Sequence, residues 1–107
     1  MNFNEYQKLA KTTAIYDKKH QILYPALGLA GEAGEVANKV KKIIRDGYEN
    51  NKDYRADIGA EIGDVLWYCA VLASDIGLEL SDIAVSNTVK LKDRMNRGVI
   101  GGNGDKR

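Results

Sequence analysis

The sequence has little of the chemistry that would tie it to a disulfide scaffold or a zinc site. Its 107 residues include one cysteine, one histidine and one proline. Cys69 therefore has no partner for an intrachain disulfide, and its apolar neighbours predict a buried, reduced thiol. Uncharged apolar stretches do not exceed about ten residues, which is too short to span a bilayer. The first residues also lack the basic-then-apolar pattern of a signal peptide, so we expect a cytoplasmic protein with no membrane partner.

An excess of charge of one sign is also absent. Sixteen basic and fifteen acidic residues leave a formal charge of +1, so no overall field attracts nucleic acid and we expect no nucleic-acid partner. A hydrophobic fraction of 44% and a charged fraction of 29% are ordinary for a globular protein. The length predicts a single domain over residues 1–107, in which the glycine-rich residues 98–107 form a flexible tail.

Alternating strand patterns are absent too, and apolar residues instead recur at helical spacing in four segments. We expect helices over residues 4–19, 25–45, 54–76 and 82–97. Pro25 suits a first helical turn, Gly77 suits a helix C-terminus, and Ser81 is a good N-cap. The sequence therefore predicts an all-α fold with a four-helix core bundle.

The third of these segments is apolar on all sides between residues 65 and 73. Such a helix must be covered on more than one side. Three partner helices from one short chain do not suffice for this, so we expect the chain to form an oligomer.

Two acid pairs with the same spacing are the main functional signal. Glu32 and Glu35 form one pair, and Glu61 and Asp64 form the other. Helical residues three apart lie about 5–6 Å from each other, and helices joined by a short connection pack antiparallel, so the pairs can face each other. Carboxylates within about 6 Å repel by roughly 3 kcal/mol at an effective dielectric near 20. A divalent cation removes that cost, and oxygen ligands without His or Cys favour Mg²⁺, with Mn²⁺ as a substitute.

Other interpretations of the acid pairs stay open at this point. The acids could form a solvated helix face, or the nearby Lys39, Lys41 and Lys42 could neutralise them. A di-iron carboxylate site is a further alternative, but it needs Glu-x-x-His motifs. The single histidine, His20, falls in an expected loop, which argues against iron.

Glycines in the helix of the first acid pair need a reason. Gly28, Gly31 and Gly34 recur at three-residue spacing, and each costs about 1 kcal/mol relative to alanine inside a helix. Close approach of a neighbouring helix or of a ligand would explain them. A partly irregular segment is the alternative.

A row of polar and basic side chains lies along the fourth segment. Asn87, Lys90, Arg94 and Arg97 follow at steps of three, four and three residues, so they share one side of the helix. Three cations with an amide suit a polyanion such as a triphosphate, although a solvated basic face is the alternative. A metal ion with cationic side chains is the combination that phosphoryl chemistry uses.

The segments around these residues resemble the MazG-type all-α nucleoside triphosphate pyrophosphohydrolases. The family pattern is Glu-x-x-Glu, a spacer and Glu-x-x-Asp, met here with residues 36–60 as the spacer. The resemblance extends over about residues 24–107. It is carried by the segments GLAGEAGEVANKVKK, EIGDVLWYCAVLA and NTVKLKDRMNRG.

The resemblance implies hydrolysis of a nucleoside triphosphate between the α- and β-phosphates, giving a nucleoside monophosphate and pyrophosphate. It further implies that Glu32, Glu35, Glu61 and Asp64 ligate Mg²⁺ or orient the attacking water. Lys90 and Arg94 would hold the phosphates, with Asn87, Arg97 and Lys39 as an extension of that set. Family members form homodimers or homotetramers.

The residues that contact the base do not carry over from the family. Trp67, Tyr68, Tyr24 and His20 are candidates by residue type, and Trp67 is expected on a different side of its helix from the acids. Two other functions stay open, namely a nucleotide-binding module without turnover and a structural bundle that assembles with a partner chain.

Overall fold

The computed structural model describes residues 1–107 and contains only helices and turns. The four helices and two short 3₁₀ segments are α1 (Phe3–Thr12), η1 (Lys18–His20), α2 (Leu23–Asp46), η2 (Tyr48–Asn50), α3 (Tyr54–Asp75) and α4 (Leu80–Asn96). The all-α fold expected from the sequence is confirmed. None of the helices combines the length and the apolar character needed to cross a membrane.

The first helix is shorter than the sequence predicts. It ends at Thr12, where the hydroxyls of Thr12 and Thr13 donate to the carbonyls of Leu9 and Ala10 at 2.6 and 2.9 Å. Local hydrogen bonds of this kind compete with continuation of a helix. The expected extension of the helix to residue 19 was therefore wrong.

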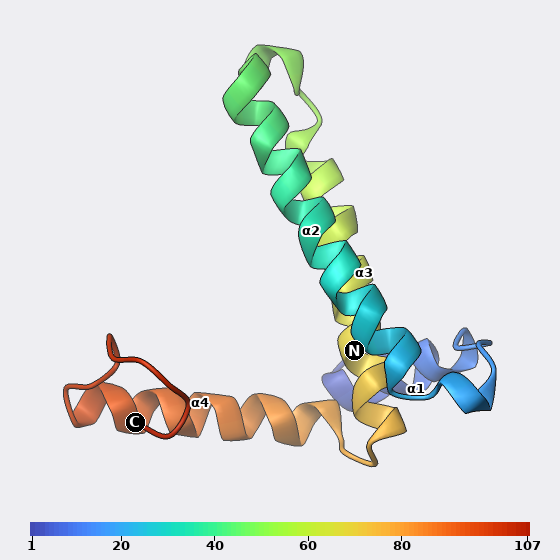
Figure 1. Ribbon diagram of the computed structural model, residues 1–107, viewed down its shortest axis with the longest axis vertical. Helices are drawn as coiled ribbons and strands as arrows, with labels where there is room; N and C mark the ends of the chain where they lie inside the picture. The colour runs from blue at the N-terminus through green and yellow to red at the C-terminus, as the bar shows by residue number, and fades with distance from the viewer.

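Helices α2 and α3 form a long antiparallel hairpin, and α1 packs against α3 near the open end of that hairpin (Figure 1). The chain reverses at Gly47, whose φ of +83° is the left-handed conformation that favours glycine. The side chain of Asn51 then donates to the carbonyls of Gly47 and Lys42 at 2.8 and 3.3 Å. This connection places the two acid-bearing helices side by side.

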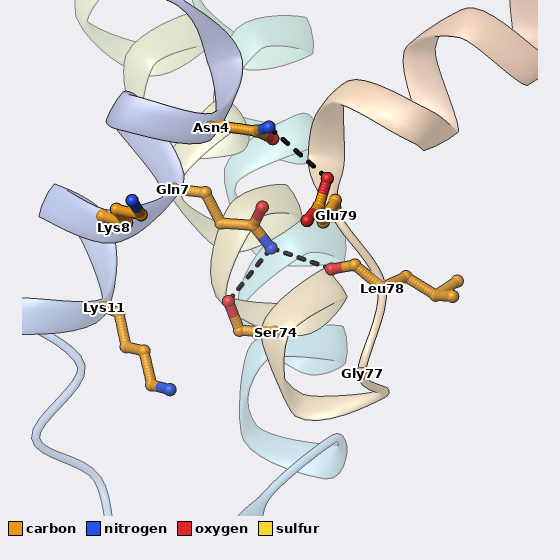
Figure 2. A pocket seen from close by; sticks show the side chains of 8 residues that line it. All are labelled: Asn4, Gln7, Lys8, Lys11, Ser74, Gly77, Leu78 and Glu79. Atoms are coloured by element: carbon orange, nitrogen blue, oxygen red, sulfur yellow. Dashed lines mark hydrogen bonds between the residues drawn. The ribbon is translucent and has the colours of Figure 1, made fainter.

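The fourth helix leaves the hairpin at its open end and extends away from it (Figure 1). Its start is fixed by Gln7 of α1, whose Nε2 donates to Ser74 Oγ and to the Leu78 carbonyl, both at 3.0 Å (Figure 2). The Oε1 atom of Gln7 accepts from the backbone N–H of Leu80 at 2.9 Å. The N–H of Leu80 lies in the first turn of α4, where the sequence predicted that Ser81 would cap the helix. The cap prediction was wrong, because α4 already begins at Leu80.

Few side chains are buried within one chain. The buried apolar residues are Ala10, Ala70, Val71, Ala73 and Leu80. The accessible surface is 7791 Å², whereas a compact monomer of 11.8 kDa has about 5,900 Å². The radius of gyration is 16.7 Å, against about 13 Å for a compact chain of this length. A single copy therefore leaves much of its apolar surface uncovered.

Candidate metal centre

Three of the four predicted carboxylates converge where α2 and α3 lie side by side. Glu32 comes from α2, and Glu61 and Asp64 come from successive turns of α3. One carboxylate oxygen of each residue lies within 4.8 Å of those of the other two. Glu32 and Glu61 are half-buried, whereas Asp64 is exposed. The antiparallel hairpin thus brings together acids that are separated by about thirty residues in the sequence.

The fourth predicted carboxylate, Glu35, lies outside this cluster. It is exposed and comes one turn after Glu32 on α2. We refer to Glu32, Glu61 and Asp64 as the acidic cluster.

The acidic cluster has no cationic partner within the chain. None of the salt bridges in the structure involves its members, and Lys39, Lys41 and Lys42 form no ion pair with them. Hydrogen bonding with Glu61, followed by partial burial and the charge of Asp64, raises the pKa of Glu32. Neutralisation by lysine is thus not observed. A set of oxygen donors that repel one another and have no counter-charge fits a hard divalent cation.

A shallow cavity of about 350 Å³ adjoins the acidic cluster. Its lining consists of Thr13, Glu32, Asp64, Trp67 and Tyr68. Trp67 therefore lies beside the acids, and its expected placement on a different side of α3 was wrong, because helical residues three apart are neighbours. The indole Nε1 of Trp67 donates to Thr13 Oγ1 at 2.8 Å. Thr13 is a residue of this site that no sequence signal indicated.

The aromatic wall of the cavity depends on a glycine of α2. A Cβ atom on Gly28 would lie 2.1 Å from Cε1 of Tyr68, so only glycine leaves room for this ring. The close approach expected from the glycine spacing is confirmed at this position. By contrast, a Cβ atom on Gly31 or Gly34 would meet nothing within 4 Å.

The remaining base candidates lie apart from the cavity. His20 is exposed in η1 and does not contribute to its lining. Tyr24 stacks on Tyr16 with ring centroids 4.7 Å apart and is tilted towards Tyr68 at 6.4 Å. Of the four candidates, Trp67 and Tyr68 are therefore the ones that adjoin the acidic cluster.

The basic row lies on α4, which runs away from the hairpin (Figure 1). No α4 residue lines the cavity beside the acids. Arg94 is 4% exposed and donates to the carbonyl and carboxylate of Asp105, while Lys90 donates to the same carboxylate at 2.8 Å. Arg97 pairs with Asp93 at 2.9 Å. Asn87 is exposed. Within one chain, the row therefore does not face the acids.

Residues 19–99 match the family model of the MazG nucleotide pyrophosphohydrolase domain. This match spans most of the chain and includes both acid pairs. The chain belongs to this family, and the resemblance seen in its sequence is confirmed.

The chain is also similar over its full length to a phage protein. The Gene 37 protein of Mycobacterium phage L5 is 45% identical over 117 aligned positions, which cover 100% of both chains. No solved structure matches the chain.

Proposed function

We propose that this protein is a Mg²⁺-dependent nucleoside triphosphate pyrophosphohydrolase that releases a nucleoside monophosphate and pyrophosphate. Membership of the MazG family supports nucleotide pyrophosphohydrolase activity in general. The observation that carries the proposal is the acidic cluster, in which three carboxylates from two helices lie within 4.8 Å without a neutralising side chain. Such a donor set suits Mg²⁺ or Mn²⁺.

The acidic cluster would hold the ion, and Glu35 is our proposed fourth carboxylate at its edge. A bound divalent cation supplies a Lewis acid that polarises a phosphoryl oxygen. A carboxylate that does not ligate the ion can accept the proton of the attacking water. Trp67 and Tyr68 offer aromatic faces beside the cavity, on which a base could stack.

The phosphate groups need cations, for which we propose the α4 row. Lys90 and Arg94 would bind the phosphates, extended by Asn87 and Arg97, and Lys39 of α2 would add a further charge. Guanidinium groups suit this task, because they present several donors in a plane. In one chain, however, α4 extends away from the acidic cluster (Figure 1).

We further propose a homodimer or homotetramer in which a second copy brings its α4 to the acidic cluster. The chain exposes about 1,900 Å² more than a compact monomer of its mass, which is about twice the area that each partner buries in a standard protein interface. Glycines that no contact within the chain explains also support this assembly. A Cβ atom on Gly31, Gly34, Gly59 or Gly63 would meet nothing within 4 Å.

The test is a panel of nucleoside triphosphates, assayed separately for pyrophosphate and orthophosphate with Mg²⁺ or Mn²⁺. We expect pyrophosphate from at least one nucleotide and loss of the activity with EDTA. Glu61→Gln keeps the shape of the side chain but removes a charged ligand, and we expect the rate to fall by about 10²–10⁴.

Glu49→Gln is the matched control, because Glu49 lies in η2 at the closed end of the hairpin, outside the acidic cluster. We expect this variant to keep the full rate. A folded wild-type protein that hydrolyses no nucleotide with either metal would refute the proposal.

A nucleotide-binding module without turnover is the alternative function. The observation in its favour is that, within one chain, the basic row of α4 does not face the acidic cluster. Thermal stabilisation by nucleotide and Mg²⁺ without any product would identify such a module.

A further inference from the structure

Residues 98–107, which the sequence leaves as a flexible tail, fold back on themselves beside the end of α4. We call this segment the strap. Arg107 holds it by donating from Nε to the Val99 carbonyl at 3.1 Å, from Nη2 to the Ile100 carbonyl at 3.0 Å, and from Nη1 to the Gly104 carbonyl. Gly104 has a φ of +82°, a conformation that favours glycine. The strap is therefore a specific turn in which one guanidinium group bonds to three backbone carbonyls.

The strap covers the two central cations of the basic row. The carboxylate of Asp105 accepts from Lys90 Nζ at 2.8 Å and from Arg94 Nη2 at 3.2 Å, and its backbone carbonyl also accepts from Arg94. The side chain of Arg94 is 5% exposed, whereas that of Asp105 is 80% exposed. A phosphate group cannot reach Arg94 while the strap lies in this position.

Asp105 and a phosphate group use the same chemistry at this site. Both present anionic oxygens to lysine and guanidinium donors, and such charge-assisted bonds are stronger than neutral ones. Hydrogen bonds from Lys90 and Arg94 lower the pKa of Asp105, so its carboxylate is charged at neutral pH. The strap and a polyphosphate therefore compete for the same donors.

We propose that the strap is an autoinhibitory latch, in which Asp105 occupies Lys90 and Arg94 in place of the phosphate groups of a nucleotide. The latch opens when a polyphosphate displaces Asp105, and it closes again when the product leaves. This inference rests on the proposed role of the α4 row as the phosphate-binding surface. It makes Asp105 a competitor of the substrate, and removal of its charge should tighten the binding of polyphosphate.

The test compares the binding of inorganic tripolyphosphate to four full-length proteins by calorimetry in the absence of divalent metal. Asp105→Asn keeps the size of the side chain and removes its charge. Arg107→Ala removes the group that holds the strap. Asp46→Asn is the control, because it breaks an exposed pair with Arg45 at 2.7 Å at the other end of the molecule.

We expect Asp105→Asn and Arg107→Ala to bind tripolyphosphate about tenfold more tightly than the wild type. Asp46→Asn should bind it like the wild type. In the nucleotide assay, Asp105→Asn should lower KM and leave kcat unchanged, a division that a loss of folding would not produce.

Unchanged or weaker binding by Asp105→Asn, in a protein whose circular dichroism matches the wild type, would overturn the latch. If the wild type is active in that case, the proposed enzymatic function is still supported and only the latch is refuted. Tighter binding by both variants in a protein that hydrolyses nothing supports the latch and refutes the enzyme, so the two failures are distinguishable.

Discussion

Gln7 is a residue whose amide joins three parts of the molecule. It is 9% exposed, and its side chain bonds to the end of α3, to the following turn and to the first residue of α4 (Figure 2). Its Oε1 atom satisfies the buried N–H of Leu80, while its Nε2 atom bonds to the part-buried hydroxyl of Ser74 and carbonyl of Leu78. The direction in which α4 leaves the hairpin therefore depends on this side chain.

We expect Gln7→Leu to lower the free energy of unfolding by about 2–3 kcal/mol. Leucine fills a similar volume but leaves the buried Leu80 N–H unpaired and removes a donor from the part-buried Leu78 carbonyl. A buried unpaired group costs about 1–3 kcal/mol. Urea denaturation at fixed protein concentration measures the change. Gln21→Leu is the control, because Gln21 is exposed, and a comparable loss there would contradict the explanation.

Residue spacing predicted the convergence of the acids but not the wall beside them. Glu32, Glu61 and Asp64 could be inferred because an acid-x-x-acid pattern on two antiparallel helices brings acids of both helices together, although the same pattern also placed Glu35 in the cluster, where the structure does not have it. Thr13 could not be inferred, since it reaches Trp67 only because α1 ends there and packs against α3. Contacts set by tertiary packing leave no local pattern in the sequence.

At the scale of elements, α2 and α3 pack closely at Gly28, which has no side chain. Gly28 lies under the ring of Tyr68, which also contacts Trp67 at a centroid distance of 5.0 Å in an edge-to-face arrangement. The packing of the two helices and the shape of the cavity are therefore linked through Tyr68.

We expect Gly28→Ala to destabilise the protein by about 1–3 kcal/mol, because the added methyl displaces the Tyr68 ring. The effect should be much smaller in a Tyr68→Ala background, where the methyl group has space. A double-mutant cycle measured by urea denaturation gives the coupling between the two residues. Equal effects of Gly28→Ala in both backgrounds would show that the ring is not the cause.

The existence of the helices was predictable, but the faces that they bury were not. A helical wheel places Ile62 and Ile76 in the core stripe of α3, yet they are 55% and 49% exposed. The residues of α3 buried most deeply are Ala70, Val71 and Ala73, where α1 and the start of α4 pack against it. Periodicity identifies the apolar sides of a helix. Which of these sides is buried depends on where the other helices pack against it.

At the scale of the whole molecule, the acids and the cations are separated within one chain. The acidic cluster lies on the hairpin, and the basic row lies on α4, which extends away from the hairpin (Figure 1). Apolar residues of α4 are exposed as well, among them Val85, Val89 and Met95 at 59%, 63% and 63%. Association of copies would cover this surface and complete the site.

Mixing two inactive variants tests this arrangement. Glu61→Gln removes a proposed metal ligand and Arg94→Ala removes a proposed phosphate ligand, so we expect each variant alone to be inactive. After joint refolding, random assortment into dimers with shared sites restores about a quarter of the sites. The measurement is pyrophosphate release, with light scattering of the mixture as the control for assembly.

A refolded mixture that is no more active than its components would show that each copy supplies both groups of residues. A monomer at micromolar concentration in the light-scattering experiment would contradict the assembly itself.

The chain reversal at Gly47 lies at the end of the hairpin remote from its chemistry (Figure 1). Adding seven residues, which make about two helical turns, to both legs at that end would lengthen the arm and keep the carboxylates of Glu32 and Glu61 opposite each other. Adding one residue within the part of α3 that packs against α2 would rotate the side chains beyond it by about 100°. The closed end of the hairpin can therefore accept insertions of about two helical turns in both legs. An insertion between the acids and the part of α3 that packs against α1 would change the relative orientation of the two regions.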